Sequence, residues 1–149
     1  MAAHPVKERR NKIMCGIVGY VGAKECTAIL VNSLTKLEYR GYDSAGIAVF
    51  EGDRIKTVKA KGKLKEGLIK KLENEPHFTA TAGIGHTRWA THGEPSDINS
   101  HPIGNGRVSI VHNGIIENYR KLKEFLISKG YGFESQTDTE AVAKLLDYN

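Results

Sequence analysis

The chain carries the stretch Met14-Cys15-Gly16-Ile17-Val18-Gly19-Tyr20, in which a cysteine stands directly before a short apolar run. Such a run predicts a buried strand over residues 16–21, with Cys15 placed at its start as a nucleophile would be. If Cys15 were the first residue, its own α-amino group could serve as the base, because free α-amino groups and thiols both titrate near pH ~8. Fourteen residues precede Cys15, however, and a peptide nitrogen cannot accept that proton.

Length and composition predict one globular domain without a membrane span. The chain has 149 residues, of which 40% are hydrophobic and 26% charged, enough for a core of its own. No apolar run approaches the ~20 residues of a transmembrane helix, and the N-terminus lacks the apolar segment of a secretory signal. The two cysteines, Cys15 and Cys26, match neither a CxxC pair nor a zinc motif, so we expect a reduced cytoplasmic protein.

The charge is uneven along the chain. Residues 1–14 hold four basic side chains against one acidic one, and thus carry +3 of the net charge of +5. The rest is nearly balanced, so no nucleic-acid partner is expected. We interpret residues 1–14 as an N-terminal extension, whether a propeptide, a misassigned start or a tag-like addition, and residues 15–149 as the domain.

Strand and helix patterns alternate after residue 14. Apolar residues at helical spacing predict a helix over 25–38, and two apolar runs predict a hairpin of 45–50 with 55–60 around Gly52-Asp53. A further helix is expected from Leu64 to before Pro76, and strands over 83–88 and 108–112, the latter preceded by the turn at residues 104–106.

Two helices are expected near the end of the sequence. The first includes Tyr119, with Asn118 as its cap and Gly130 as its stop, and a capping box from Thr137 to Glu140 opens the second. The second helix has barely begun where the sequence ends, so we expect an incomplete domain. This order of elements favours an α+β or layered α/β sandwich. The glycine fingerprint of a dinucleotide fold and the P-loop are absent from the sequence.

Three polar clusters could carry chemistry. Residues 39–46 place several polar side chains between a helix and a strand, but taken alone they are better explained as a polar loop with two turn glycines. Residues 85–96 combine Arg88, Trp89, Thr91 and His92 at the end of a strand, where an exposed loop is the alternative to a ligand site. Arginine grips a carboxylate at two points, whereas the histidine spacing does not favour a metal.

The third cluster contains Asn113 and Gly114, directly after a predicted strand. A side-chain amide and a glycine N–H are suitable oxyanion donors, although Asn-Gly is also a common tight turn. Asp138 could pair with a substrate ammonium or simply complement the dipole of the last helix. If Arg88 took a carboxylate and Asp138 an ammonium, the ligand would be an α-amino acid with a carbonyl for Cys15 to attack, and glutamine is the obvious case.

Six motifs in order resemble the glutaminase domain of the glucosamine-6-phosphate synthases. These are class II glutamine amidotransferases within the N-terminal-nucleophile hydrolases. The motifs lie at residues 15–20, 37–46, 85–93, 100–102, 112–119 and 137–140, and the resemblance covers 15–149. It implies an αββα sandwich of two facing antiparallel sheets between helix layers, here truncated at the C-terminus.

The resemblance also implies roles for individual residues. Cys15 would be the nucleophile and its freed amine the base, and Asn113 and Gly114 would form the oxyanion hole. Arg88 would hold the glutamine α-carboxylate and Asp138 its α-amine. For the remaining positions, Thr91 and His92 would lie in the loop that closes on glutamine, Trp89 would help gate the ammonia path, and Arg40 would help place the start of the chain.

The implied reaction releases ammonia and glutamate through a γ-glutamyl thioester, without a metal or organic cofactor. In the full-length relatives the ammonia would go to an isomerase domain that binds fructose 6-phosphate, in a homodimer. Three alternatives remain open: an inactive fragment of this domain, an ammonia-donating domain of another amidotransferase such as amidophosphoribosyltransferase, and a module that binds glutamine without hydrolysing it.

Overall fold

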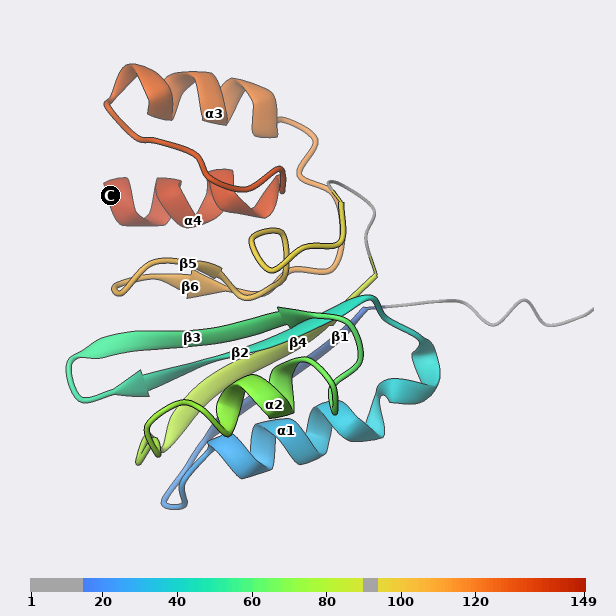
Figure 1. The fold of residues 1–149 in the computed structure, drawn as a ribbon. Helices are drawn as coiled ribbons and strands as arrows, with labels where there is room; N and C mark the ends of the chain where they lie inside the picture. The colour runs from blue at the N-terminus through green and yellow to red at the C-terminus, as the bar shows by residue number, and fades with distance from the viewer. Residues whose placement is uncertain (1–14, 90–93) are drawn as a thin grey trace, which may run out of the picture.

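A four-stranded antiparallel sheet and a two-stranded sheet form the centre of the fold, with helices outside each (Figure 1). The computed structural model describes residues 15–89 and 94–149. Its elements are β1 (Gly16–Val21), α1 (Thr27–Lys36), the 3₁₀ helix η1 (Glu38–Arg40), β2 (Ser44–Glu51), β3 (Arg54–Lys61), α2 (Leu68–Leu72), β4 (Ala82–Arg88), β5 (Ile103–Gly104), β6 (Ser109–Ile110), α3 (Tyr119–Ser128) and α4 (Thr139–Tyr148).

The larger sheet has the strand order β1-β4-β2-β3 with antiparallel neighbours. β2 and β3 form the expected hairpin, in which Glu51 pairs with Arg54 and Gly52 turns the chain at φ +65°. A two-residue loop requires such a positive φ, which glycine adopts without strain. β4 lies between β1 and β2, so its C-terminal residue Arg88 meets the start of both neighbours, opposite Ser44 on β2.

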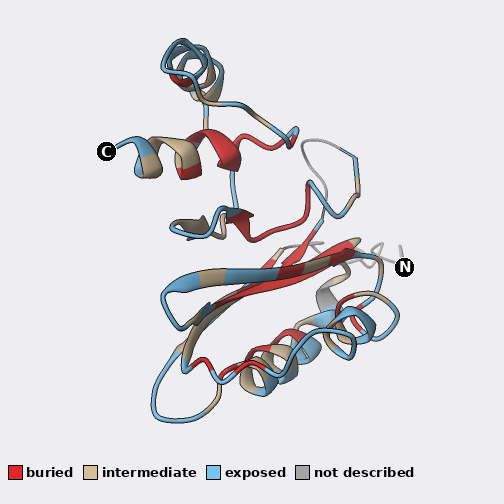
Figure 2. Cartoon of the chain, turned by 60° about the vertical axis from the view of Figure 1, so that its left-hand side comes forward, coloured by how far each residue is buried: buried red, intermediate tan, exposed pale blue. Residues whose placement is uncertain are grey.

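Helices α1 and α2 cover one face of this sheet (Figure 1). The apolar side of α1 contributes Leu30 and Leu34, both fully buried, and these pack against β2 residues such as Ile47. The red, buried residues concentrate between the helices and the sheet (Figure 2). Apolar burial of this kind is the main stabilising term of the fold.

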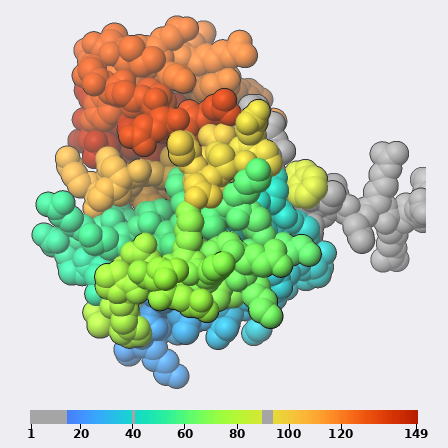
Figure 3. Space-filling model, viewed as in Figure 1, coloured from blue at the N-terminus to red at the C-terminus, as the bar shows by residue number. Residues whose placement is uncertain are grey.

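The opposite face carries the β5–β6 hairpin, followed by α4 and then α3 (Figure 1). The loop before β5 and the β5–β6 hairpin rest directly on β2 and β3 in the space-filling view (Figure 3). The N–H of Ile55 on β3 donates to the carbonyl of Gly106 at 2.9 Å. The layers therefore run helix, sheet, sheet, helix, as expected of an αββα sandwich.

Several predicted elements are observed, most of them with different ends. The strand over 16–21 is observed with those bounds, but it lies at the edge of the sheet and only its first residue, Gly16, is buried, so the prediction of a buried strand is wrong. The helix expected over 25–38 spans Thr27–Lys36. The helix expected from Leu64 begins only at Leu68, because residues 64–67 form turns. The strand expected over 108–112 is reduced to Ser109–Ile110, and its partner β5 was not predicted.

The predicted capping box at the last helix is wrong. The helix begins at Thr139, and Thr137 instead shares a hydrogen bond with the hydroxyl of Ser135 at 2.7 Å. The Glu140 carboxylate accepts from the N–H groups of Glu134 and Ser135 at 2.9 and 2.6 Å. Glu140 thus fixes the loop before the helix rather than the first turn of the helix itself.

Within the described ranges, no helix is long and apolar enough to cross a membrane.

Candidate active site

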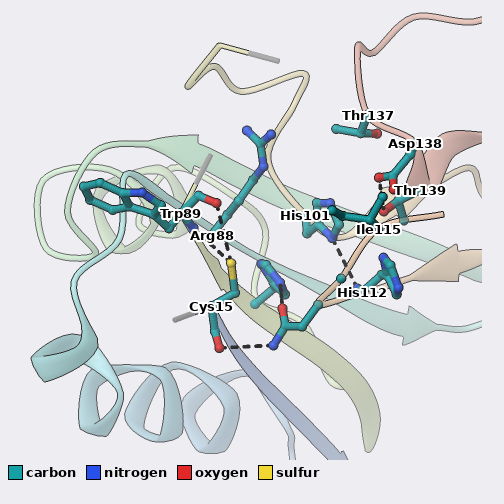
Figure 4. A pocket seen from close by; sticks show the side chains of 12 residues that line it. Cys15, Arg88, Trp89, His101, His112, Ile115, Thr137, Asp138 and Thr139 are labelled. Atoms are coloured by element: carbon teal, nitrogen blue, oxygen red, sulfur yellow. Dashed lines mark hydrogen bonds between the residues drawn. The ribbon is translucent and has the colours of Figure 1, made fainter. Parts of the chain in front are cut away.

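A cleft of about 330 Å³ opens where β1 and β4 meet the segment after β6 and the start of α4. Its walls come from parts of the chain far apart in sequence, as the close-up shows (Figure 4). The lining residues are Cys15, His86, Arg88, Trp89, His101, His112, Asn113, Gly114, Ile115, Thr137, Asp138 and Thr139. Its volume lies at the small end of the range for ligand sites in proteins.

Cys15 lies at the floor of the cleft, one residue before β1. Its sulfur accepts a hydrogen bond from the N–H of Trp89 at 3.2 Å and lies 3.6 Å from the Trp89 carbonyl oxygen (Figure 4). The next residue, Gly16, donates its N–H to the Thr87 hydroxyl at 3.1 Å. Strand pairing between β1 and β4 therefore sets the position of the thiol, which is partly exposed to the cleft.

The amide of Asn113 lies beside Cys15. Its Nδ2 donates to the Cys15 carbonyl at 3.1 Å, and its Oδ1 lies 2.7 Å from Nε2 of His86. The following residue, Gly114, has φ +146°, and an added Cβ there would lie 3.2 Å from the His112 ring. The backbone conformation at this position therefore favours glycine.

Arg88 ends β4 with a buried side chain that is 4% exposed. Burial lowers the pKa of its guanidinium, while Asp43, Cys15 and Asp138 act electrostatically to raise it. An arginine stays charged despite such a shift. The cleft thus contains a fixed positive charge. The exposed ring of the next residue, Trp89, points away from the Arg88 guanidinium (Figure 4).

Asp138 supplies a negative charge from the opposite wall. It immediately precedes α4, is 5% exposed, and accepts a hydrogen bond from the N–H of Ile116 at 2.6 Å. Its side chain makes no capping hydrogen bond to the helix, so a helix-capping role does not account for it. Its carboxylate also interacts electrostatically with Arg88.

Two stacked histidines form the inner wall. The rings of His86 on β4 and His101 lie 4.5 Å apart, and both side chains are buried. Burial lowers the pKa of His86 to about 4 and, together with nearby positive charges, that of His101 to about 2. Both rings are therefore neutral at pH 7, and Nδ1 of His101 accepts the N–H of His112 at 3.3 Å.

A lysine on β3 holds the loop that carries His101. Nζ of Lys59 on β3 donates to the carbonyls of Ile98, Ser100 and Pro102 at 3.1, 2.9 and 3.3 Å. Gly46 on β2 allows this loop to approach, because a Cβ at that position would collide with the His101 carbonyl. The sheet therefore positions a loop that has no regular structure of its own.

The structure brings six of the predicted site residues to one cleft: Cys15, Arg88, Trp89, Asn113, Gly114 and Asp138. The predicted residues Thr91 and His92 lie outside the described residues, as does the side chain of Arg40. Sequence reasoning assigned no role to His86 or His101. One signal was available for His86, a histidine that follows an apolar, small-residue run, Ala82 to Gly85, within a predicted strand.

Within residues 15–89 and 94–149, no cluster of three or more His, Cys, Asp or Glu side chains has the arrangement of a metal site.

Comparison with known proteins identifies the family. The profile of the glutamine amidotransferase domain matches residues 73–148. A glutamine–fructose-6-phosphate aminotransferase (isomerizing) from Caldanaerobacter subterraneus subsp. tengcongensis is 58% identical over 137 residues, which are 91% of this chain and 22% of that protein. The protein of the same name from Clostridium tetani is 61% identical over 137 residues, with the same two coverages.

Solved structures agree with this fold. The B. subtilis glutamine phosphoribosylpyrophosphate amidotransferase, solved with ADP and GMP, superimposes with a TM-score of 0.73 at 28% identity, over 89% of this chain and 29% of that one. A structure described as the allosteric regulatory enzyme of purine biosynthesis gives a TM-score of 0.75 at 29% identity over the same shares.

The chain spans about a fifth of the length of the curated relatives it matches. The matched profile covers half of the chain. The names of the curated relatives include glutamine. The chain belongs to the glutamine amidotransferase domain family.

Proposed function

We propose that this domain hydrolyses glutamine to glutamate and ammonia, with Cys15 as the nucleophile. The observation that carries the proposal is the single cleft that contains a thiol, an amide donor and two opposite charges. Arg88 is suited to a carboxylate and Asp138 to an ammonium, so together they select an α-amino acid. Arg88 and Asp138 are far apart in sequence, so their presence in one cleft is not explained by the composition of a single loop and supports a shared ligand.

In the proposed reaction, the Cys15 thiol transfers its proton to a base and the sulfur attacks the side-chain carbonyl carbon of glutamine. The oxygen becomes an oxyanion, which accepts hydrogen bonds from Asn113 Nδ2 and the N–H of Gly114. The carbon–nitrogen bond then breaks, and ammonia leaves with the proton that the base held. Water hydrolyses the resulting thioester, which releases glutamate and restores the thiol.

The base in this proposal is the α-amine of Cys15. It becomes available only if the bond between Met14 and Cys15 is cut or Met14 is the initiator that is later removed. A freed amine has the pKa of a base that works near neutral pH. In the sequence as given, the nitrogen of Cys15 is an amide, so we propose that residues 1–14 are absent from the active form.

The relatives support a proposal for the fate of the ammonia. The curated matches are named for aminotransfer to fructose 6-phosphate, so we propose that the complete protein uses the ammonia to make glucosamine 6-phosphate. An isomerase domain would bind the sugar phosphate, in a cytoplasmic homodimer. The identities of 53–61% to these relatives favour this acceptor over the phosphoribosyl acceptor of the structural neighbours, at 28–29%.

The test is glutamate release by the protein with Cys15 as its first residue, compared with Cys15→Ala and with a form that retains residues 1–14. We expect hydrolysis only in the first form. Glutamine binding without glutamate release by that form would contradict the proposal and support the binding-module alternative.

A further inference from the structure

We propose that His86 is a positioning residue that fixes the amide of Asn113 with its nitrogen toward Cys15. The bond at the centre of this proposal is the 2.7 Å contact between Nε2 of His86 and Oδ1 of Asn113. An amide oxygen only accepts hydrogen bonds, so Nε2 of His86 must carry the proton. No role was assigned to this histidine by the sequence motifs.

Two neighbours together exclude the flipped amide. If the amide of Asn113 turned by 180°, its oxygen would face the carbonyl oxygen of Cys15, which now accepts from Nδ2 at 3.1 Å. Two acceptors would then meet without a proton between them, and the flip would also remove the acceptor from the Nε2–H of His86. The second proton of Nδ2 remains available for a ligand in the cleft.

The anchor is rigid, whereas the residue that it holds is exposed. His86 is fully buried on the central strand β4 and stacks on His101. Asn113 is exposed on the loop after β6, where a side chain would otherwise sample several rotamers. His101 fixes the backbone of the same loop, because its Nδ1 accepts the N–H of His112. The two stacked rings thus hold two successive residues of the loop, His112 through His101 and Asn113 through His86.

The orientation does not depend on the charge of His86. Protonation adds a proton at Nδ1 and leaves the Nε2–H in place, so both forms donate to Asn113. The groups that face this ring include Arg88 and His112, which disfavour the charged form, and His101 above its face. We therefore expect the amide orientation to persist as the pH changes.

The kinetic consequence rests on the proposed glutaminase function. His86→Leu fills the buried site with an apolar side chain and removes the donor, so the Asn113 amide loses its fixed orientation. We expect kcat to fall by about tenfold or more, within the ~10²–10³ cost of losing an oxyanion donor altogether, with KM changed less than about threefold. His86→Gln, whose amide nitrogen can reach the Nε2 position, should recover most of kcat.

A double-mutant comparison separates positioning from general damage. In an Asn113→Ala background there is no amide to orient, so His86→Leu should change kcat by less than about twofold. Ile47→Val, a core change on β2 outside the cleft lining, serves as the control for lost stability and should leave kcat unchanged. An equal loss of kcat from His86→Leu in both backgrounds would overturn the proposal.

A spectroscopic arm distinguishes failure of this proposal from failure of the proposed function. In the full chain, nitrogen NMR should show His86 protonated at Nε2 only, and the Asn113 amide proton that is bonded to the Cys15 carbonyl should be protected from exchange. His86→Leu should remove that protection, and Ile47→Val should not. If the wild-type protein released no glutamate, the proposed function would fail and this spectrum alone would decide. An unprotected Asn113 amide in the wild type, or one unaffected by His86→Leu, would overturn the proposal.

Discussion

Acid should destabilise this protein well above the pH at which carboxylates titrate, because two neutral histidines are buried together. The rings of His86 and His101 stack at 4.5 Å, and burial lowers their pKa values from 6.5 to about 4 and about 2. Unfolding exposes both to water and restores ordinary values. The unfolded state therefore binds more protons than the folded state below pH 6.5, so stability falls as the pH falls.

The magnitude follows from the size of the window. The contribution of the two neutral rings to stability is fully present above pH 6.5. It is lost as the pH falls from 6.5 toward their folded-state pKa values. A pH of 5 lies about one and a half units below the pKa of histidine in the unfolded state. At about 1.4 kcal/mol per unit, each ring then lowers the free energy of unfolding by about 2 kcal/mol, and the pair lowers it by about 4 kcal/mol. This is a large part of the ~5–15 kcal/mol that stabilises an ordinary domain.

The assay is urea denaturation followed by circular dichroism, at pH 8 and at pH 5. His101→Phe keeps an aromatic ring on His86 but cannot titrate, so the difference between the two pH values should fall to about half. His77→Gln, at an exposed histidine, is the matched control and should leave the difference unchanged. A wild-type difference below about 1 kcal/mol, or a full difference in His101→Phe, would refute the reasoning.

Three further predictions concern single residues. Lys59→Met removes the donor to three loop carbonyls and should lower the free energy of unfolding by about 3 kcal/mol or more in urea, whereas Lys56→Met, on the same strand but exposed, should cost little. Gly114→Ala forces a side chain into a φ of +146° at ~1–3 kcal/mol of strain. The melting temperature should fall by about 2–4 °C per kcal/mol of that strain, kcat for glutamine should fall as well, and an unchanged kcat would contradict the assigned role. Asp138→Asn removes the anion from the cleft and should raise KM for glutamine about tenfold or more, measured by glutamate release; an equal KM would exclude the proposed ammonium contact.

Local sequence patterns predicted most of the first sheet and its helices. β1 runs from Gly16 to Val21 as its apolar pattern indicates, and the Gly52-Asp53 turn places the β2–β3 hairpin in register. These elements are specified by neighbouring residues: an apolar run with a glycine turn, or leucines at helical spacing. Their places along the chain are therefore readable from local sequence. The burial of β1 is not, because its place at the edge of the sheet leaves only Gly16 buried.

The second sheet could not be predicted in the same way. β5 has only two residues, Ile103 and Gly104, too few to show alternation, and it is held by β6 and by contacts to α4. The capping box failed for a related reason. Glu140 has stronger partners in the loop at residues 134–135 than in its own helix, and that competition depends on tertiary structure.

The sequence predicted the residues that could contact a ligand, but not the residues that hold them in place. Cys15, Arg88, Asn113 and Asp138 have side chains whose chemistry suggests a ligand, and the structure places them in one cleft. The sequence contains no signal for how the amide of Asn113 is held. That information lies in the register of β4, which points His86 at a loop that follows 27 residues later.

The most direct test of the central claim is the mass of the Cys15-containing peptide, isolated after an acid quench of the native protein during glutamine turnover. We predict a peptide that begins at Cys15, carries a free α-amine and holds one γ-glutamyl group on its sulfur. Glutamate release with Cys15 unmodified, or with Cys15 still joined to Met14, would contradict the account.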